Sequence, residues 1–384
     1  MMNYVMLKEV CAINMGQSPD SDSYNENGEG VPFFQGNADF GERYPVTRKW
    51  CTAPTKMAAA EDILISVRAP IGAMNYATEE CCIGRGLAAL TPNKTKVSPE
   101  FIFWLLKGKN EELNNKGTGS TFKAIGRKVL EETLVPDIDL EAQIECSKIL
   151  EKVYSIIQNR KQELQKLDEL VKARFVEMFG DPIQNPKGWD TPLIENLVAN
   201  EKNALKAGPF GSALKKEYYV ESGYKIYGQE QVISGDHTIG NYYIDKEHYK
   251  TLANCAVQAG DVLISLVGTY GKLLIIPDEF EPGIINPRLM KITFDKNKVN
   301  PLYFKFFFQS ESLKRVLSEN THGGTMDILN LGIVRKISMP LPPLKLQNKF
   351  VSFVEQVDKS KIAVQNALEK AQLLFDSLMQ EYFG

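Results

Sequence analysis

The chain has 384 residues, of which 43% are hydrophobic and 24% are charged, an ordinary composition for a folded protein. At roughly 100–200 residues per domain, this length predicts about two domains. No stretch approaches the roughly 18 uninterrupted apolar residues of a membrane helix, and the N-terminus lacks a signal-peptide pattern, so we expect a cytoplasmic protein without membrane contact. The formal net charge of −3 gives no support to DNA binding, although a basic face can coexist with an acidic one.

The spacing of cysteines and histidines does not predict a metal site. The six cysteines are too sparse for a disulfide scaffold and fit a reducing cytosol. There is no C-x-x-C pair, and the three histidines are not spaced near any cysteine pair, so we expect no structural zinc.

Four segments follow one another along the chain. Residues 1–136 contain short β-like runs broken by Gly and Pro, which predict a compact mixed domain. Residues 137–180 predict one long helix that begins after a proline. Residues 181–340 repeat the first pattern and residues 341–384 repeat the second, so the sequence predicts an α+β fold with two tandem domains and two long helices.

Each predicted helix carries an apolar stripe at alternating three- and four-residue steps, the heptad pattern of a coiled coil. In the first helix, seven of nine stripe positions are apolar: Leu150, Val153, Ile157, Arg160, Leu164, Leu167, Val171, Arg174 and Met178. Moving 204 residues along gives eight apolar or aromatic positions of nine: Val354, Val357, Lys361, Val364, Leu368, Ala371, Phe375, Leu378 and Tyr382. Gly180 is placed to end the first helix, with Pro182 beyond it.

The chain repeats itself with a period of about 200 residues. Three residues of the first half match the second at an offset of 204: Pro136 with Pro340, Gln143 with Gln347, and Val153 with Val357. Two earlier matches have slightly smaller offsets: residues 61–67 with 260–266 at 199, and Gly86-Leu87 with Arg288-Leu289 at 202. An ordered series of this kind predicts duplicated domains whose loops differ in length.

The two stripes predict how the helices are used. A helix over 141–179 would be about 58 Å long at 1.5 Å per residue, and its stripe must be covered. Because the chain returns between the helices, pairing them as an antiparallel coiled coil is the economical solution. Two similar domains held by such a rod would form a bipartite DNA reader, since one DNA turn is about 34–36 Å. A generic dimerisation stalk is the simpler interpretation, but it needs no matched domain at each end.

This order of domain, helix, domain, helix resembles the DNA-specificity subunit of type I restriction–modification systems. Residues 178–182 (MFGDP) and 185–189 (NPKGW) are similar to the family's junction between the first helix and the second domain. The Leu-Val-Pro segment at 134–136 and the Met-Pro-Leu-Pro-Pro segment at 339–343 are also similar to the family. The resemblance covers nearly the whole chain, and the repeated arrangement carries most of it.

The resemblance implies that the chain binds double-stranded DNA and has no catalytic site or cofactor of its own. Two adenine-N6 methyltransferase subunits would dock on the helices, and a restriction subunit that translocates DNA would complete the complex. S-adenosylmethionine, ATP and Mg²⁺ would belong to these partners.

The residues themselves do not favour an enzyme. An amino-methyltransferase needs Asn or Asp followed by Pro-Pro and an aromatic residue, and neither Asn286-Pro287 nor Asn185-Pro186 continues in this way. Residues 117–121 (GTGST) lack the ending of a P-loop, and the G-x-G at 84–86 lacks the rest of a dinucleotide-binding motif. The carboxylates of residues 136–141 lack the lysine of a nuclease motif.

Readout of DNA needs hydrogen-bonding side chains on loops, with Lys and Arg for phosphates. In the first domain the best candidates are Gln35, Asn37, Arg43, Tyr44, Arg68, Ser120, Thr121 and Lys123. In the second domain they are Ser212, Lys215, Tyr227, Gln229, Tyr270, Lys272, Arg288, His322 and Thr325. The Gly-rich loops GTGST and HGGT are equivalent across the repeat, whereas Phe34 and Phe210 are expected in the core.

Two other functions remain open. One is a coiled-coil adaptor with two protein-binding heads. The other is a specificity subunit of a related system in which modification and cleavage are fused.

Overall fold

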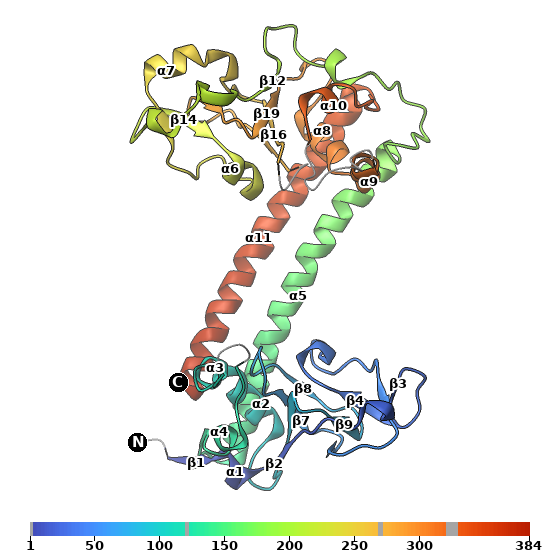
Figure 1. Cartoon of the computed structure of the whole chain (residues 1–384), viewed down its shortest axis with the longest axis vertical. Coiled ribbons are helices and arrows are strands. Elements are labelled where there is room, and N and C mark those ends of the chain that lie inside the picture. Colours follow the sequence, from blue (N-terminus) through green and yellow to red (C-terminus); the bar gives the residue numbers. More distant parts are fainter. Residues whose placement is uncertain (1–2, 120–122, 268–271, 320–328) are drawn as a thin grey trace. The chain divides into compact units, whose positions relative to one another are not determined.

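The computed structural model describes residues 3–119, 123–267, 272–319 and 329–384, and the chain divides into two compact units. Unit 1 consists of Met1–Gln162 with Val364–Gly384, and unit 2 consists of Glu163–Ala363. Each unit contains one mixed region of strands and short helices, together with one part of each long helix (Figure 1). The predicted mixed fold with two tandem domains is confirmed.

Unit 1 is built on a four-stranded sheet of order β2-β10-β7-β8 and a five-stranded sheet of order β3-β5-β4-β9-β6, with β1 paired to β11. Its elements are β1 (Tyr4–Met6), α1 (Leu7–Val10), β2 (Cys11–Met15), β3 (Tyr24–Asn25), β4 (Val31–Phe34), β5 (Trp50–Cys51), β6 (Met57–Ala58), β7 (Ile63–Ser66), β8 (Met74–Tyr76), β9 (Cys81–Ile83), β10 (Leu87–Pro92), α2 (Pro99–Gly108), α3 (Asn110–Asn115), α4 (Arg127–Glu131), β11 (Leu134–Pro136) and the first part of α5 (Leu140–Phe179).

Unit 2 repeats this plan with sheets of order β12-β19-β16-β17 and β13-β15-β14-β18. Its elements are β12 (Leu205–Ala207), β13 (Tyr219–Val220), β14 (Tyr224–Tyr227), α6 (Gln229–Ser234), β15 (Tyr243–Ile244), α7 (Lys246–Thr251), β16 (Val262–Ser265), β17 (Leu273–Ile275), β18 (Gly283–Ile285), β19 (Leu289–Ile292), α8 (Pro301–Phe308), α9 (Glu311–Glu319), α10 (Leu331–Arg335) and the first part of α11 (Leu344–Phe383). The matched segments 61–67 and 260–266 contain β7 and β16, which occupy the same place in the two four-stranded sheets.

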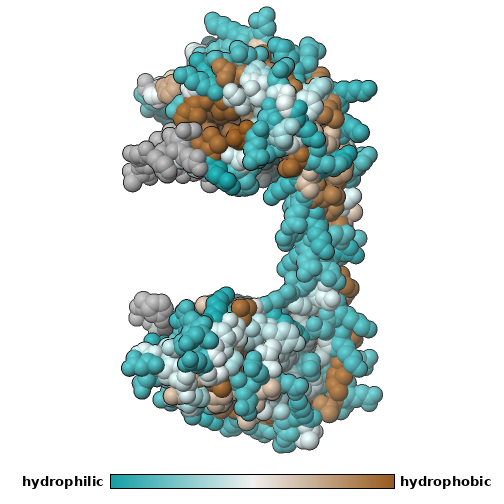
Figure 2. All heavy atoms as spheres, turned by 90° about the vertical axis from the view of Figure 1, so that its right-hand side faces the viewer, coloured by the Kyte–Doolittle hydropathy of each residue, from teal (hydrophilic) through white to brown (hydrophobic). Residues whose placement is uncertain are grey.

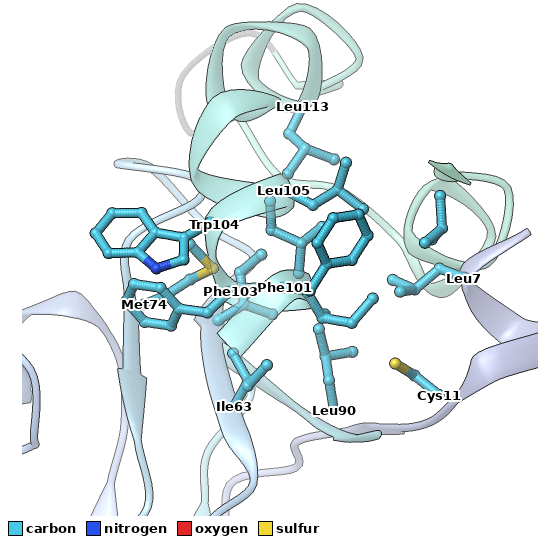
Figure 3. Packing of buried hydrophobic residues seen from close by; sticks show 14 of the residues in the cluster. Leu7, Cys11, Ile63, Met74, Leu90, Phe101, Phe103, Trp104, Leu105 and Leu113 are labelled. Carbon is cyan, nitrogen blue, oxygen red and sulfur yellow. The ribbon is translucent and has the colours of Figure 1, made fainter. Parts of the chain in front are cut away.

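Helix α2 is the centre of the unit 1 core. Pro99 suits its first position because its φ is already helical, and Glu100 favours the positive end of the helix dipole. All six residues from Phe101 to Leu106 are buried, so the helix is covered on every side. Figure 3 shows its aromatic side chains among those of Ile63 and Leu90 from the sheet.

Helix α8 has the same role in unit 2. Asn300 caps it by accepting a hydrogen bond from the Leu302 amide at 2.9 Å, and Pro301 follows at the first position. Four aromatic residues of α8 are buried: Tyr303, Phe304, Phe307 and Phe308. Burying each such ring contributes about 1.5–3 kcal/mol, so these two short helices anchor the two cores.

The predicted stripes of the long helices are covered. All nine stripe positions in each helix are buried or half-buried. In unit 1, Tyr154 of α5 lies against Phe375 of α11, with ring centroids 6.1 Å apart. In unit 2, Phe175 of α5 lies 5.5 Å from Phe350 of α11. The one charged position of the second stripe, Lys361, is neutralised by Asp168, with Nζ and Oδ1 2.6 Å apart.

The first long helix ends as predicted at Gly180, whose φ of +82° is the left-handed conformation that favours glycine. The junction is fixed by hydrogen bonds: the Trp189 indole donates to the Phe179 carbonyl at 3.1 Å, and the Trp189 amide donates to Asn185 Oδ1 at 3.0 Å. The MFGDP and NPKGW segments are therefore a structural corner, and their polar atoms are used within it.

Gln143 and Gln347, matched by sequence, make the same three hydrogen bonds in the two units. Gln143 Oε1 accepts from the Ser98 amide at 2.9 Å, and its Nε2 donates to the carbonyls of Lys96 and Ile138. Gln347 Oε1 accepts from the Asn300 amide at 2.9 Å, and its Nε2 donates to the carbonyls of Lys298 and Pro342. Each buried glutamine ties the start of a long helix to the start of a core helix.

We predict that Gln347→Leu destabilises unit 2 by about 2–4 kcal/mol, because one amide and two carbonyls lose their buried partner. The urea midpoint of the full chain measures this loss. Gln365→Leu is the matched control, since Gln365 is exposed on the same helix and bonds only to Glu369 within the helix. Equal midpoints for the two variants would refute the role of Gln347.

Candidate nucleic-acid interface

In unit 1, four loops are joined side by side by backbone hydrogen bonds at the ends of the parallel strands β4 and β9. The Gly84 amide donates to the Phe34 carbonyl at 2.8 Å, and the Val67 amide donates to the Gly86 carbonyl at 2.9 Å. The Ala69 amide donates in turn to the Lys123 carbonyl at 3.0 Å. We call this row of segments, residues 34–37, 84–86, 67–69 and 123–125, the loop edge of unit 1.

The loop edge of unit 1 presents polar and basic side chains. Gln35, Arg68, Arg85 and Lys123 are exposed, and Asn37 is half-buried. The segments pack closely, since a Cβ on Gly86 would lie 2.3 Å from the Gln35 carbonyl oxygen. The structure therefore brings together four of the residues expected to contact DNA, two amides and two cations.

Unit 2 has an equivalent loop edge at the ends of the parallel strands β14 and β18, formed by residues 227–229, 286–288, 265–267 and Lys272. The Asn286 amide donates to the Tyr227 carbonyl at 2.9 Å, and the Leu266 amide donates to the Arg288 carbonyl at 2.9 Å. The Ser265 amide donates to the Lys272 carbonyl at 3.0 Å, which corresponds to the bond from the Ser66 amide to the Ala73 carbonyl in unit 1, so Lys272 stands in the place of Ala73 and not of Lys123. The offset of 202 between Gly86 and Arg288, seen in the sequence, is thus a true structural equivalence.

The polar side chains on the loop edge of unit 2 form hydrogen bonds with one another. Arg288 Nη1 donates to Gln229 Oε1 at 3.3 Å. Gln229 Nε2 donates to Ser265 Oγ at 2.9 Å and to the Val267 carbonyl at 2.5 Å. Arg288 remains exposed, so its guanidinium is oriented and still has donors for an outside acceptor.

An open pocket with a volume of about 800 Å³ lies beside this edge and forms a concave surface there. Its lining combines residues of the loop edge with the segment 214–219 and with Tyr242. The lining residues are Leu214, Lys216, Tyr219, Ile226, Gly228, Gln229, Glu230, Tyr242, Asn286, Pro287 and Arg288. Basic, amide and aromatic side chains together are the groups that contact phosphates and base edges.

The two loop edges share a backbone and differ in side chains. Gly86 in unit 1 corresponds to Arg288 in unit 2, because each carbonyl accepts from the strand-end amide of Val67 or Leu266. Gly84 corresponds to Asn286 for the same reason. Because these bonds use main-chain atoms alone, exposed side chains such as those of Arg85 and Arg288 can vary without loss of the scaffold, whereas Gly86 has no room for a side chain.

Some candidate residues lie elsewhere or have other partners. Arg43 pairs with Glu151 of α5 at 2.5 Å, and its guanidinium carbon lies 4.3 Å from the ring centroid of Phe103. Tyr44 is exposed beside it, away from the loop edge. Tyr227 is fully buried and donates its hydroxyl to the Glu281 carbonyl at 2.7 Å, and burial raises its pKa to about 12. The buried position of Tyr227 makes it a core residue.

Lys215 directly precedes the short helical turn Lys216–Tyr218 and pairs with Glu217, with Nζ and Oε1 3.2 Å apart. Ser120, Thr121, Tyr270, His322 and Thr325 lie outside the described residues, as does the side chain of Ser212. The expected equivalence of the two Gly-rich loops lies outside them as well.

Phe34 is buried as expected, but the core assignment of Phe210 is wrong, because 79% of its surface is exposed. The assignment failed because hydrophobicity was weighed without its glycine-rich setting, GPFG, in which the chain turns at the surface. Arg85, which lies between Gly84 and Gly86, is a further exposed cation on the edge of unit 1 that sequence reasoning missed. A basic residue flanked by glycines was the available signal.

Among residues 3–119, 123–267, 272–319 and 329–384, no cluster of His, Cys, Asp and Glu is arranged to hold a metal ion. No helix in these ranges is both long enough and apolar enough to cross a membrane. Figure 2 shows a visible face that is largely hydrophilic with separate hydrophobic patches.

Duplicated mixed domains with equivalent backbone edges and different side chains define a protein with two tandem recognition domains. The profile of the type I restriction modification DNA specificity domain matches residues 2–169 and again residues 207–373. The chain therefore belongs to the type I restriction–modification DNA specificity family, as a specificity subunit, the non-catalytic component of such a system.

Three known proteins of this family differ in how much of this chain they match and in how closely they match it. The MjaX type I restriction enzyme specificity subunit of Methanocaldococcus jannaschii is 44% identical over 160 residues, which cover 42% of this chain and 38% of that relative. The EcoBI specificity subunit of Escherichia coli is 19% identical over 413 residues, covering 99% of this chain and 85% of the relative. The crystal structure of the type I S subunit from M. genitalium covers all of this chain at 14% identity, with a TM-score of 0.58, and so shares its fold.

A second cation lies near Arg43 in the unit 1 core. The Lys107 ammonium sits 4.0 Å from the ring centroid of Tyr154 and 5.0 Å from that of Trp104. Burial, with the neighbouring charge of Arg43, lowers its pKa to about 8. The charged form is therefore less stable in the folded chain than in water, and the aromatic contacts offset part of this cost.

We predict that Lys107→Met raises the stability of the chain by about 1 kcal/mol at pH 7. The folded pKa of about 8 lies below the ordinary lysine value of 10.5, so the unfolded chain binds more protons between these pH values and the wild type gains stability as pH rises. The advantage of the variant should therefore shrink from pH 8 to pH 10. Thermal melts across this range test it, with exposed Lys128→Met as the control. A constant difference between the Lys107 variant and wild type would contradict the prediction.

Proposed function

We propose that the chain recognises a bipartite, asymmetric DNA site, in which each unit reads one half-site through its loop edge. The carrying observation is that the two edges share two backbone hydrogen bonds while Gly86 of one corresponds to Arg288 of the other. A common scaffold would place both edges in the same way against DNA. Different side chains would then select different bases.

The proposed contacts in unit 1 are Gln35, Asn37, Arg68 and Lys123, and those in unit 2 are Lys215, Gln229, Lys272 and Arg288. Gln and Asn suit adenine, and Arg suits guanine, because each can form two hydrogen bonds to the base edge. Lys side chains suit phosphates. The remaining candidates, Ser120, Thr121, Ser212, Tyr270, His322 and Thr325, stay proposed DNA contacts on their sequence alone.

The long helices are proposed to form an antiparallel coiled coil that sets the distance between half-sites. The buried stripes support this, as do the ring contacts between α5 and α11 within each unit. The functional segments would then be 1–136, 137–180, 181–340 and 341–384.

The partners are proposed to be two methyltransferase subunits on the helices and one restriction subunit that translocates DNA. Several apolar residues on the helices are exposed and offer contact area: Ile156, Leu170, Val176, Ile362, Leu373 and Leu374. Adenine methylation and ATP-dependent cleavage, with S-adenosylmethionine, ATP and Mg²⁺, would belong to these partners in the cytoplasm.

We predict that Arg288→Ala relaxes base preference in one half-site and weakens binding by roughly 5- to 150-fold, the value of one bidentate base contact. Sequencing of methylated adenines in cells carrying the variant measures the preference. Arg127→Ala, on exposed helix α4, is the control. Relaxation in both half-sites would contradict the assignment of one half-site to each unit.

Exchanging residues 1–136 for the recognition domain of another specificity subunit should change only the bases of the half-site that unit 1 reads.

We also predict the effect of lengthening the helices. Four residues inserted after Gln162 and four after Ala363 add one turn, about 6 Å, to each helix. The half-sites should move apart by one to two base pairs, at about 3.4 Å each, with their bases unchanged. Mapping the methylated motif reads both quantities, and altered bases at the original spacing would refute a spacer role.

A further inference from the structure

Phe210 is the most exposed large hydrophobic side chain that the structure describes. Its exposed fraction is 79%, compared with 70% for Leu373, which follows it. Burial of a phenylalanine contributes about 1.5–3 kcal/mol to folding, and Phe210 gives up nearly all of it. Folding therefore does not explain an aromatic residue at this place.

The backbone on both sides fixes where Phe210 stands. The Gly208 amide donates to the Leu289 carbonyl at 2.9 Å, and a Cβ on Gly208 would lie 1.9 Å from the Asn286 carbonyl oxygen, so the chain here is pressed against the loop edge of unit 2. Beyond Phe210, Gly211 has a φ of +59°, and the Ala213 amide closes a turn on the Phe210 carbonyl at 3.2 Å. Phe210 thus stands on a turn two residues from its anchor on the edge.

The groups around this turn are those that bind nucleic acid. Leu214 of the same segment lines the concave surface together with Gln229 and Arg288, and Lys216 lines it as well. Phe210 lies four residues before Leu214, so the chain that carries the exposed ring runs on into a surface with cations and amide groups. Aromatic rings that stack on bases, combined with charged groups that hold the backbone, are the usual parts of a nucleic-acid surface.

Unit 1 lacks this aromatic. Gly16 corresponds to Gly208, because its amide donates to the Leu87 carbonyl at 2.9 Å and a Cβ on it would lie 2.2 Å from the Gly84 carbonyl oxygen. Two residues on, Ser18 occupies the place of Phe210, and its Oγ accepts from the Arg85 amide at 3.3 Å. The same position is thus a short polar residue tied to the edge in one unit and an exposed ring in the other.

We propose that Phe210 is a specificity-determining residue that inserts its ring against an opened base step in the half-site read by unit 2. The inference rests on the proposed DNA-reading role of the loop edges. Apolar wedges of this kind unstack a base step and select sequences that deform easily, so Phe210 adds readout of DNA shape to the hydrogen bonds of Arg288 and Gln229.

The test uses the full chain and a duplex that carries the bipartite site found by mapping methylated adenines. 2-Aminopurine is placed in turn at positions of each half-site. Wild-type binding should increase its fluorescence at one step of the unit 2 half-site, because an unstacked base is less quenched. Phe210→Ala should abolish this signal and weaken binding roughly 5- to 150-fold, whereas Phe210→Trp should keep both.

Ile183→Ala is the matched control, since it removes an exposed apolar side chain of unit 2 that has no part in the loop edge or in the proposed partner contacts. Unchanged melting temperatures would show that Phe210→Ala still folds. Unchanged affinity and signal in that variant, with relaxed base preference in Arg288→Ala, would overturn the role of Phe210 alone. Absence of any site-specific binding by the wild type would instead overturn the proposed function.

Discussion

The structure depends on covering two apolar stripes that neither long helix can cover by itself. An isolated helix of 40 residues with a heptad stripe would expose that stripe to water over its whole length. Within unit 1 the start of α5 shares a core with the end of α11, and within unit 2 the end of α5 shares a core with the start of α11. Each unit is consequently completed by a segment from far along the chain.

The same constraint explains why the buried polar groups are alike in the two units and the exposed ones are not. Gln143 and Gln347 each satisfy one amide and two carbonyls where a long helix meets a core helix, so a change at either would leave buried groups unpaired. Arg288 is exposed, whereas a Cβ on Gly86 would lie 2.3 Å from the Gln35 carbonyl oxygen, so the two units differ at this position of the loop edge. The duplication therefore remains visible in the interior after it has faded on the loop edges.

Features that depend on residues close together in the sequence could be predicted, and features that depend on residues far apart in the sequence could not. The stripes, the helix end at Gly180 and the matched glutamines depend on local period and spacing, and each stands where the pattern indicated. The partners of Arg43 could not be predicted in this way, because Glu151 lies 108 residues away. The burial of Tyr227 and the exposure of Phe210 could not be predicted either, because both depend on the surrounding fold. Tyr227 is buried where its strand pairs with the parallel strand β18, which begins 56 residues later in the chain. Phe210 is exposed because it lies on a tight turn.

The close packing at Gly86 bears on how new recognition can arise in this protein. A side chain there would have to displace the Gln35 carbonyl oxygen, 2.3 Å from its first carbon, so point mutation at this site is closed to unit 1. The corresponding Arg288 is exposed and can be exchanged for other residues with its backbone intact. Unit 2 can thus change its recognition by a single substitution at this position, whereas unit 1 must change it at its other exposed edge residues, Gln35, Arg68, Arg85 and Lys123. Equivalent positions of the two loop edges are therefore not equally open to new side chains.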